Sequence, residues 1–168
     1  GQRRAKKEST PKRLAERVRN SPISAVDLFC GAGGLTYGLM QAGIRVEAGV
    51  EIDSQAEHAF RTNNPGAEFL CWDVERKNYQ SIQKLFRPGA IRLLAGCAPC
   101  QPFSKLTNGA DKHEAWNLLD NFGRFVRKIL PELVTMENVP ELEERGSDVY
   151  LRFVGTLEAY GYNVARKV

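Results

Sequence analysis

The chain of 168 residues lacks several features that would define a class of protein at once. No apolar run approaches the roughly 20 residues that cross a membrane as a helix, and the first residues contain no apolar secretory core. Only two histidines are present, which leaves little scope for a zinc site. Four cysteines without a secretory signal indicate a reducing compartment rather than a disulfide framework.

The composition is that of a folded domain, with 42% hydrophobic and 26% charged residues, so disordered and fibrous classes are excluded. The net charge of +4 conceals an asymmetry. Residues 1–20 hold eight basic and two acidic side chains, whereas the remainder holds 16 basic and 18 acidic ones. We expect residues 1–24 to form a basic leader, flexible or helical, that either contacts phosphates or is simply solvated. Residues 25–168 are expected to form one domain.

Strand and helix patterns alternate after the leader, which predicts an α/β fold with a doubly wound, mostly parallel sheet. The usual reversal of strand order places the first and fourth strands side by side. Apolar runs predict strands over residues 25–29, 45–50, 69–72, 91–95, 133–137 and 162–168. Helical spacing predicts helices over residues 35–41, 54–62, 79–86, 117–130 and 148–160.

Chemically suggestive residues follow the first three predicted strands. Gly31, Gly33 and Gly34 allow the backbone to approach a ligand closely. Glu51 ends the second strand, where an acid commonly accepts hydrogen bonds from ribose, and Asp73 ends the third. These strand ends outline a nucleoside site, without distinguishing NAD from S-adenosylmethionine. The alternatives are a solvated strand end for Glu51 and a helix cap for Asp73.

The segment GCAPCQPFS, residues 96–104, follows the fourth predicted strand. It places Cys100 on a proline-flanked turn at the edge of the sheet where open α/β sheets bind ligands, so Cys100 is a candidate nucleophile. Cys97 is expected to be a packed bystander, and Cys30 and Cys71 to be core residues. Cys97 and Cys100 have the spacing of a redox or zinc pair, but no second pair partners them, and no metal is expected.

From about residue 25 to residue 168 the chain resembles the cytosine-C5 DNA methyltransferases. Asp27-Leu-Phe-Cys-Gly-Ala-Gly-Gly-Leu35 is similar to their cofactor motif. Glu51-Ile-Asp53 and Asp73-Val74 are similar to the next two motifs. Ala98-Pro-Cys-Gln-Pro-Phe-Ser104 matches the nucleophile motif, and Glu137-Asn-Val139 matches the motif that carries the family's glutamate.

The resemblance implies a Rossmann-like methyltransferase fold with S-adenosylmethionine as cofactor. Glu51 would hold the ribose and Asp73 the adenine amino group, and Pro99 would separate the cofactor from the target base. The other cofactor residues implied are Phe29, Gly31, Gly33, Gly34, Ile52, Val74 and Leu118. The target base would be contacted by Pro99, Gln101, Ser104 and Asn138, with Asn138 positioning Glu137.

The family chemistry explains these residue types. Addition of the Cys100 thiolate to C6 of cytosine would make C5 nucleophilic, and Glu137 would contact N3 and the exocyclic amine of a base flipped out of the duplex. The polar segment 105–114 is expected to be a mobile loop that closes over this base. The expected role is DNA methylation, as in restriction–modification.

The chain departs from the family pattern at its end. The family's later arginine motif, target-recognition region and final cofactor motif do not appear. We therefore expect a catalytic portion that needs a C-terminal part, being a truncated product, an expressed fragment or one subunit of a split enzyme. DNA is the expected partner, without a membrane, in the cytoplasm of a bacterium near its nucleoid or in a eukaryotic nucleus.

Three alternatives stay open at this point. The first is a non-catalytic binding or regulatory module that keeps the methyltransferase fold. The second is an RNA cytosine-C5 methyltransferase, because the part that selects the polymer does not appear. The third is a nicotinamide-dependent dehydrogenase, although nothing in that chemistry requires Cys100 together with Glu137.

Overall fold

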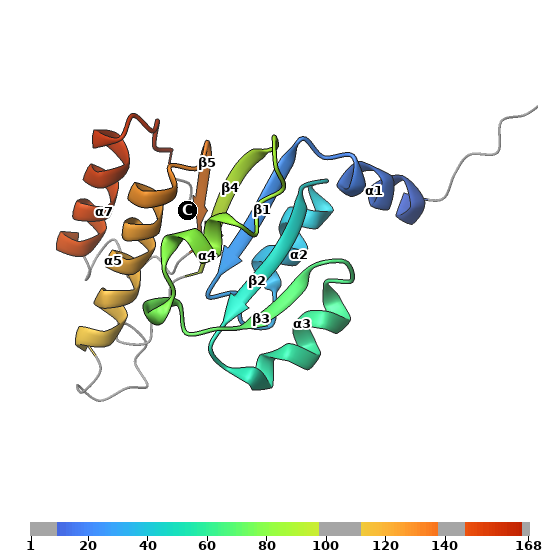
Figure 1. Ribbon diagram of the computed structural model, residues 1–168, viewed down its shortest axis with the longest axis horizontal. Helices are drawn as coiled ribbons and strands as arrows, with labels where there is room; N and C mark the ends of the chain where they lie inside the picture. Colours follow the sequence, from blue (N-terminus) through green and yellow to red (C-terminus); the bar gives the residue numbers. More distant parts are fainter. Residues whose placement is uncertain (1–9, 98–111, 138–146, 166–168) are drawn as a thin grey trace, which may run out of the picture.

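The computed structural model describes residues 10–97, 112–137 and 147–165, in which five parallel strands form one sheet (Figure 1). The strand order is β3-β2-β1-β4-β5, so the first and fourth strands are neighbours, as predicted. The order reverses at β1, which brings the carboxyl ends of β1 and β4 together at one edge of the sheet. The strands are β1 (Ile23–Leu28), β2 (Arg45–Glu51), β3 (Glu68–Cys71), β4 (Ile91–Gly96) and β5 (Leu133–Met136).

Helices connect the strands, and their predicted positions are confirmed with shifted ends. The main difference is α5, which begins at Lys112 rather than at residue 117 and so includes the end of the segment predicted to be a loop. The helices are α1 (Thr10–Arg19), α2 (Gly34–Gln41), α3 (Glu57–Asn63), α4 (Tyr79–Gln83), α5 (Lys112–Ile129) and α7 (Ser147–Ala159). Two short 3-10 turns, η1 (Ser54–Ala56) and η2 (Val74–Arg76), follow β2 and β3.

The core lies on both faces of the sheet because side chains alternate along each strand. On β1, Val26 and Leu28 face the cluster that contains α5 and α7 residues, whereas Ala25 faces the cluster under α2 and α3. In the larger cluster, Phe122 and Phe153 pack with ring centroids 5.8 Å apart and join α5 to α7. The two helices lie side by side in Figure 1. A parallel sheet covered on both faces fixes the strand ends, where the candidate site lies.

The end of α2 is the place where helix α1 of the basic leader contacts the rest of the fold. Gly43, with φ 84°, terminates α2 by donating its N–H to Met40, while Ile44 donates to Leu39. This paired bonding is a Schellman motif, which favours glycine at that position. Arg17 of α1 donates to the Ala42 carbonyl at 3.1 Å. Because α2 starts at the carboxyl edge of the sheet and runs back, α1 docks at the opposite edge.

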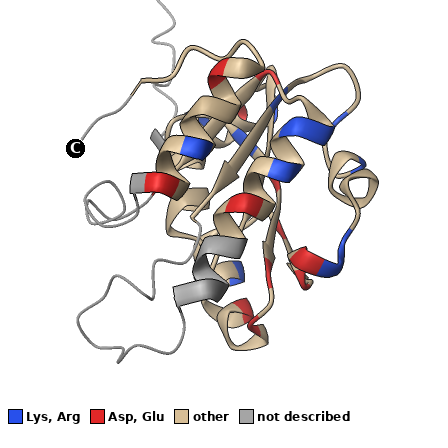
Figure 2. Ribbon diagram, turned by 90° about the vertical axis from the view of Figure 1, so that its left-hand side faces the viewer, with Lys and Arg blue, Asp and Glu red and all other residues tan. Residues whose placement is uncertain are grey.

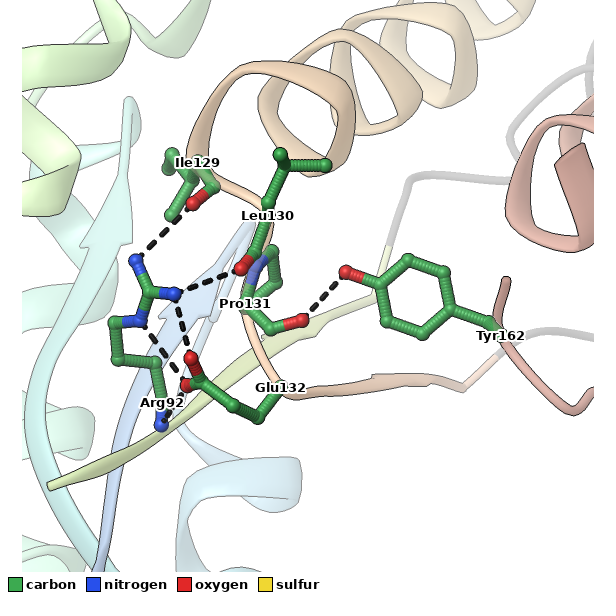
Figure 3. Close-up of polar contacts among 6 residues, drawn as sticks. All are labelled: Arg92, Ile129, Leu130, Pro131, Glu132 and Tyr162. Atoms are coloured by element: carbon green, nitrogen blue, oxygen red, sulfur yellow. Dashed lines mark hydrogen bonds and ion pairs between the residues drawn. The ribbon is translucent and has the colours of Figure 1, made fainter. Parts of the chain in front are cut away.

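The connection from α5 to β5 is held by Arg92 of β4 (Figure 3). Its guanidinium pairs with Glu132 at 2.6 Å and donates to the carbonyls of Ile129 and Leu130, which end the helix. Positive charge at a helix C-terminus is favourable. The bonds from Arg92 lower the pKa of Glu132 to about 2, so this pair stays ionised at ordinary pH.

The prediction of a strand over residues 162–168 is wrong for its described part, because residues 162–165 belong to no strand. Residues 166–168 lie outside the described ranges. Instead, the Tyr162 N–H caps α7 by bonding Leu157, with Gly161 at φ 84°. The Tyr162 hydroxyl donates to the Pro131 carbonyl (Figure 3), so the segment is drawn toward the α5–β5 connection. Across the three described ranges, no helix has the length and apolar character to span a membrane.

Candidate functional site

The glycine-rich turn after β1 has an unusual backbone. Phe29, Gly31 and Gly33 have φ values of 59°, 51° and 86°, in the left-handed region. Residues that carry a side chain rarely adopt this backbone region. Two of the three positions are accordingly glycine, and the backbone of Phe29 is locally strained. The Cys30 N–H bonds Val50 of β2 at 3.1 Å, and the Gly33 N–H bonds Cys30 at 2.8 Å. The turn is therefore fixed before any ligand binds.

Gly33 and Gly34 occupy different environments although they are adjacent. A Cβ at Gly33 would lie 2.2 Å from Asn64 Nδ2 and 2.7 Å from the Phe60 ring, and both of these side chains are fully buried. A Cβ at Gly34, or at Gly31, would meet nothing within 4 Å. Gly33 thus serves close packing of the turn on α3, whereas Gly31 and Gly34 border open space in which a ligand can approach the backbone.

Asp27 lies beneath this turn, fully buried in β1. Its Oδ2 accepts a 2.6 Å hydrogen bond from the Thr36 hydroxyl in the first turn of α2, while its buried Oδ1 has no partner. Burial raises the pKa of Asp27 to about 6, against the opposing effect of side-chain and backbone hydrogen bonds from Thr36. Sequence analysis gave this residue no role of its own, although a charged residue inside an apolar strand was the available signal.

Glu51 joins the ends of β1 and β2. Its Oε2 accepts from the Gly31 N–H at 2.9 Å, and its Oε1 accepts from the Ile52 and Asp53 N–H groups at 2.8 and 3.1 Å. The carboxylate is therefore held in place rather than solvated freely, and Oε2, which accepts from one donor, has room for a further donor. Glu51 ends β2, as the sequence predicted, but its bond to the turn was not anticipated, and its contact with ribose stays a prediction.

These contacts restrict what the turn can bind. A turn that binds phosphate offers unpaired N–H groups at the start of a helix. Here the Gly31 N–H is occupied by Glu51, the Gly33 N–H by Cys30, and Thr36 bonds Asp27. The N–H groups of Gly31 and Gly33 are thus not available to a phosphate. The turn is better suited to an uncharged or cationic group with hydroxyl or amine donors.

Apolar groups flank the two carboxylates. Ile52 follows β2 and is 64% exposed, which is unusual for a large apolar side chain beside polar groups. Phe29 is half-buried against the larger core cluster, which also contains Val74, only 4% exposed. A flat apolar ligand could contact the exposed Ile52 and the half-buried Phe29. The Val74 side chain packs within the core and offers such a ligand little surface.

Asp73 follows β3 and caps the 3-10 turn η2. Its Oδ1 accepts from the Glu75 N–H at 3.0 Å, and its Oδ2 pairs with Arg76 at 3.1 Å. The capping alternative is therefore observed, and contact with an adenine stays a prediction. Asn121 of α5 bonds Glu75 at 3.0 Å. Because Leu118 lies one turn before Asn121, the half-buried Leu118 is brought toward the same turn after β3.

Two cysteines differ in their environments. Cys30 is buried, as predicted, and burial together with Asp27 and Glu51 raises the pKa of its thiol well above the ordinary range. It is therefore a poor nucleophile. The prediction of a core position for Cys71 is wrong, because this residue is exposed and its thiol faces the Ile52 carbonyl at 3.5 Å. It ends β3, which in the described part of the chain lies at one end of the strand order and pairs only with β2.

Glu137 lies directly after β5, beside the end of β4. Its N–H bonds the Gly96 carbonyl at 3.0 Å, and its Oε2 accepts from the Cys97 thiol at 2.9 Å. The half-buried Cys97 therefore has a polar partner, and the prediction that it is a bystander to the chemistry stays untested. Among the described residues, no three His, Cys, Asp or Glu side chains are arranged to hold a metal ion.

The remaining predicted site residues lie outside the described ranges, so their positions stay predictions. They are Pro99, Cys100, Gln101, Ser104 and Asn138. The side of the molecule that carries α5 and α7 shows acidic and basic residues interspersed rather than a basic face (Figure 2). Asp120 and Arg152, for example, lie 3.8 Å apart across these helices. Strong phosphate binding is not expected from such a mixture.

Comparisons with known proteins agree with this architecture. M.HgiDII, a Type II methylase of Herpetosiphon aurantiacus, is 37% identical over 147 residues, which cover 86% of this chain and 41% of the relative. A prophage-encoded E. coli protein described as a DNA modification methyltransferase has a similar structure, with a TM-score of 0.67 and 28% identity, over 82% of this chain and 38% of its own. The S. pombe Dnmt2 methyltransferase, 22% identical with a TM-score of 0.62 over 83% of this chain and 41% of its own, shares the fold.

The parallel sheet and the occupied glycine turn define a Rossmann-like fold of the methyltransferase type. The family model of C-5 cytosine-specific DNA methylases matches residues 23–168, and the chain belongs to this family. The chain spans about two fifths of the length of M.HgiDII.

We predict that Gly33→Ala destabilises the fold by about 2–4 kcal/mol, because the added Cβ would have an unfavourable φ and would collide with buried Asn64 and Phe60. Gly34→Ala is the matched control, since its Cβ meets open space, and it should change stability by less than about 1 kcal/mol. Urea unfolding measures both. Equal effects of the two substitutions would contradict this account of the turn.

We also predict a pH-dependent gain in stability for Asp27→Asn. The pKa of Asp27 rises from 3.8 to about 6 on folding, so the folded state holds this proton more tightly, and wild-type stability falls as pH rises between these values. The variant cannot ionise and retains an acceptor for Thr36. Its free energy of unfolding relative to wild type should therefore increase by up to about 3 kcal/mol between pH 4 and pH 7.

Urea unfolding of both proteins at a series of pH values checks this second prediction. Parallel stability profiles for wild type and Asp27→Asn would show that Asp27 does not titrate as described.

Proposed function

We propose that this chain is the cofactor-binding and catalytic part of an enzyme that methylates C5 of cytosine in DNA. The observation that carries the proposal is the position of Glu137 beside the end of β4, because the Cys100 motif follows that strand in the sequence. A family match over residues 23–168, which includes both the nucleophile and glutamate motifs, supports it. Relatives named Type II methylases suggest a place in restriction–modification.

S-adenosylmethionine is the cofactor that the described residues fit. It carries no phosphate, which suits a turn whose N–H groups are already paired with Glu51 and Cys30. A ribose hydroxyl would bond the remaining lone pair of Glu51 Oε2, and the adenine would lie against Ile52 and Phe29. The acidic edge also favours a cationic sulfonium. When bound, S-adenosylmethionine supplies an electrophilic methyl group.

The chain's own residues would prepare the cytosine. The Cys100 thiolate adds to C6, and the electron pair of the C5–C6 double bond moves toward C5, which becomes nucleophilic. Glu137 shares a proton with N3 and accepts a hydrogen bond from the exocyclic amine, which holds the base and stabilises the negative charge that the addition places on the ring. After C5 is methylated, loss of its proton restores the double bond and expels the thiolate. The base must first leave the DNA stack.

A C-terminal part is included in the proposal, since the complete relatives are more than twice as long as their match to this chain. That part, in the same chain or in another, would select and hold the DNA. The basic leader is not suited to this task, because α1 docks through Arg17 at the edge of the sheet opposite to the site. Action on DNA would place the protein in the compartment that holds DNA.

The test is capture of the covalent adduct. DNA containing 5-fluorocytosine cannot lose a proton from C5, so the protein should stay attached to it on a denaturing gel in the presence of S-adenosylmethionine. The chain is assayed alone and with the C-terminal part of a Type II relative. We expect the adduct to form in wild type and in Cys71→Ala, and to be absent in Cys100→Ala.

Failure to form an adduct even with the C-terminal part would contradict catalysis and favour a non-catalytic module. An adduct with 5-fluorocytosine RNA but not with DNA would contradict the proposed substrate.

A further inference from the structure

The ends of β4 and β5 bring Cys97 and Glu137 directly opposite each other. The two strands pair in parallel with Gly96 aligned to Met136, so the next residue of each strand lies opposite the other on the same face. Both backbones are fixed: the Cys97 N–H bonds Leu28 of β1 at 3.2 Å, and the Glu137 N–H bonds Gly96 at 3.0 Å. Their side chains therefore meet because of strand register.

The contact between these side chains is a hydrogen bond from the Cys97 thiol to Glu137 Oε2, with 2.9 Å between sulfur and oxygen. Glu137 is exposed, so packing does not select one rotamer of its side chain. Within the described ranges, Cys97 is the side chain that bonds its carboxylate. A thiol that donates this bond carries its proton, which distinguishes Cys97 from a thiolate nucleophile.

We propose that Cys97 is a positioning residue, whose thiol holds the Glu137 carboxylate in the orientation that the target base requires. The inference rests on the proposed function, in which Glu137 contacts the base. With Oε2 held by the thiol, the carboxyl group keeps one orientation, in which it would face both N3 and the exocyclic amine of cytosine. Without the donor, the exposed carboxylate samples several rotamers, and fewer of them place it against the base.

The kinetic test compares Cys97→Ala, which removes the donor, with Cys97→Ser, which keeps one, and with Cys71→Ala as a control thiol. Methyl transfer to DNA is measured with the C-terminal part supplied. We expect Cys97→Ala to lower kcat about tenfold, because it removes a hydrogen bond to the charged Glu137 carboxylate. The KM for S-adenosylmethionine should be unchanged, because Glu137 is proposed to contact the base and not the cofactor. Cys97→Ser should recover most of kcat, and Cys71→Ala should match wild type.

A spectroscopic test needs no activity. The Raman S–H stretching band of Cys97, identified by its loss in Cys97→Ser, should lie at lower frequency in wild type than in Glu137→Ala, because donation of a hydrogen bond weakens the S–H bond. The Cys71 band should be the same in both proteins. A structural role in folding alone would not shift the Cys97 band selectively.

The outcomes separate the two proposals. An unshifted Cys97 band, or equal kcat in Cys97→Ala and wild type, overturns the positioning role and leaves the proposed function intact. A shifted band in a protein that transfers no methyl group upholds the contact and overturns the proposed function, and with it the role of that contact in catalysis.

Discussion

The candidate site depends on the pairing of the protein's own carboxylates with the turn that follows β1. Asp27 bonds Thr36 at the start of α2, and Glu51 bonds the Gly31 N–H from the end of β2. Both acids are placed by parallel strands that end at the same edge. Together they fix the turn, and Glu51 occupies the Gly31 N–H, a donor that a phosphate could otherwise use. The proposed preference for a cofactor without phosphate therefore rests on hydrogen bonding within the protein.

A second pairing, between the ends of β4 and β5, lies on the side proposed to bind the base. The register of β4 and β5 aligns Cys97 with Glu137, as the Glu51 contact aligns the turn with β2. In both places a hydrogen bond between neighbouring strand ends holds an exposed carboxylate or a strained turn. The sheet thus keeps the proposed cofactor side and the proposed base side of the site in fixed positions relative to each other.

Sequence patterns predicted that the first and fourth strands are neighbours, that a glycine-rich turn follows the first and that Glu51 ends the second, because alternation, glycine spacing and strand ends are local signals. They could not predict contacts that depend on which strands become neighbours. Cys71 was placed in the core because sequence does not show that β3 lies at one end of the order of the described strands, and the role of Cys97 depends on the register with β5. The strand expected after Gly161 fails because the Tyr162 hydroxyl reaches Pro131, a long-range bond without a local signature.

The most direct test of the central claim is calorimetric titration of the chain with S-adenosylmethionine and, separately, with NADH. We expect S-adenosylmethionine to bind and NADH not to bind. Glu51→Gln should weaken the binding of S-adenosylmethionine about tenfold, because the carboxylate loses its charge, while Glu68→Gln at the amino end of β3 should leave it unchanged. Tight binding of NADH without binding of S-adenosylmethionine would contradict the claim that the occupied turn selects a cofactor without phosphate.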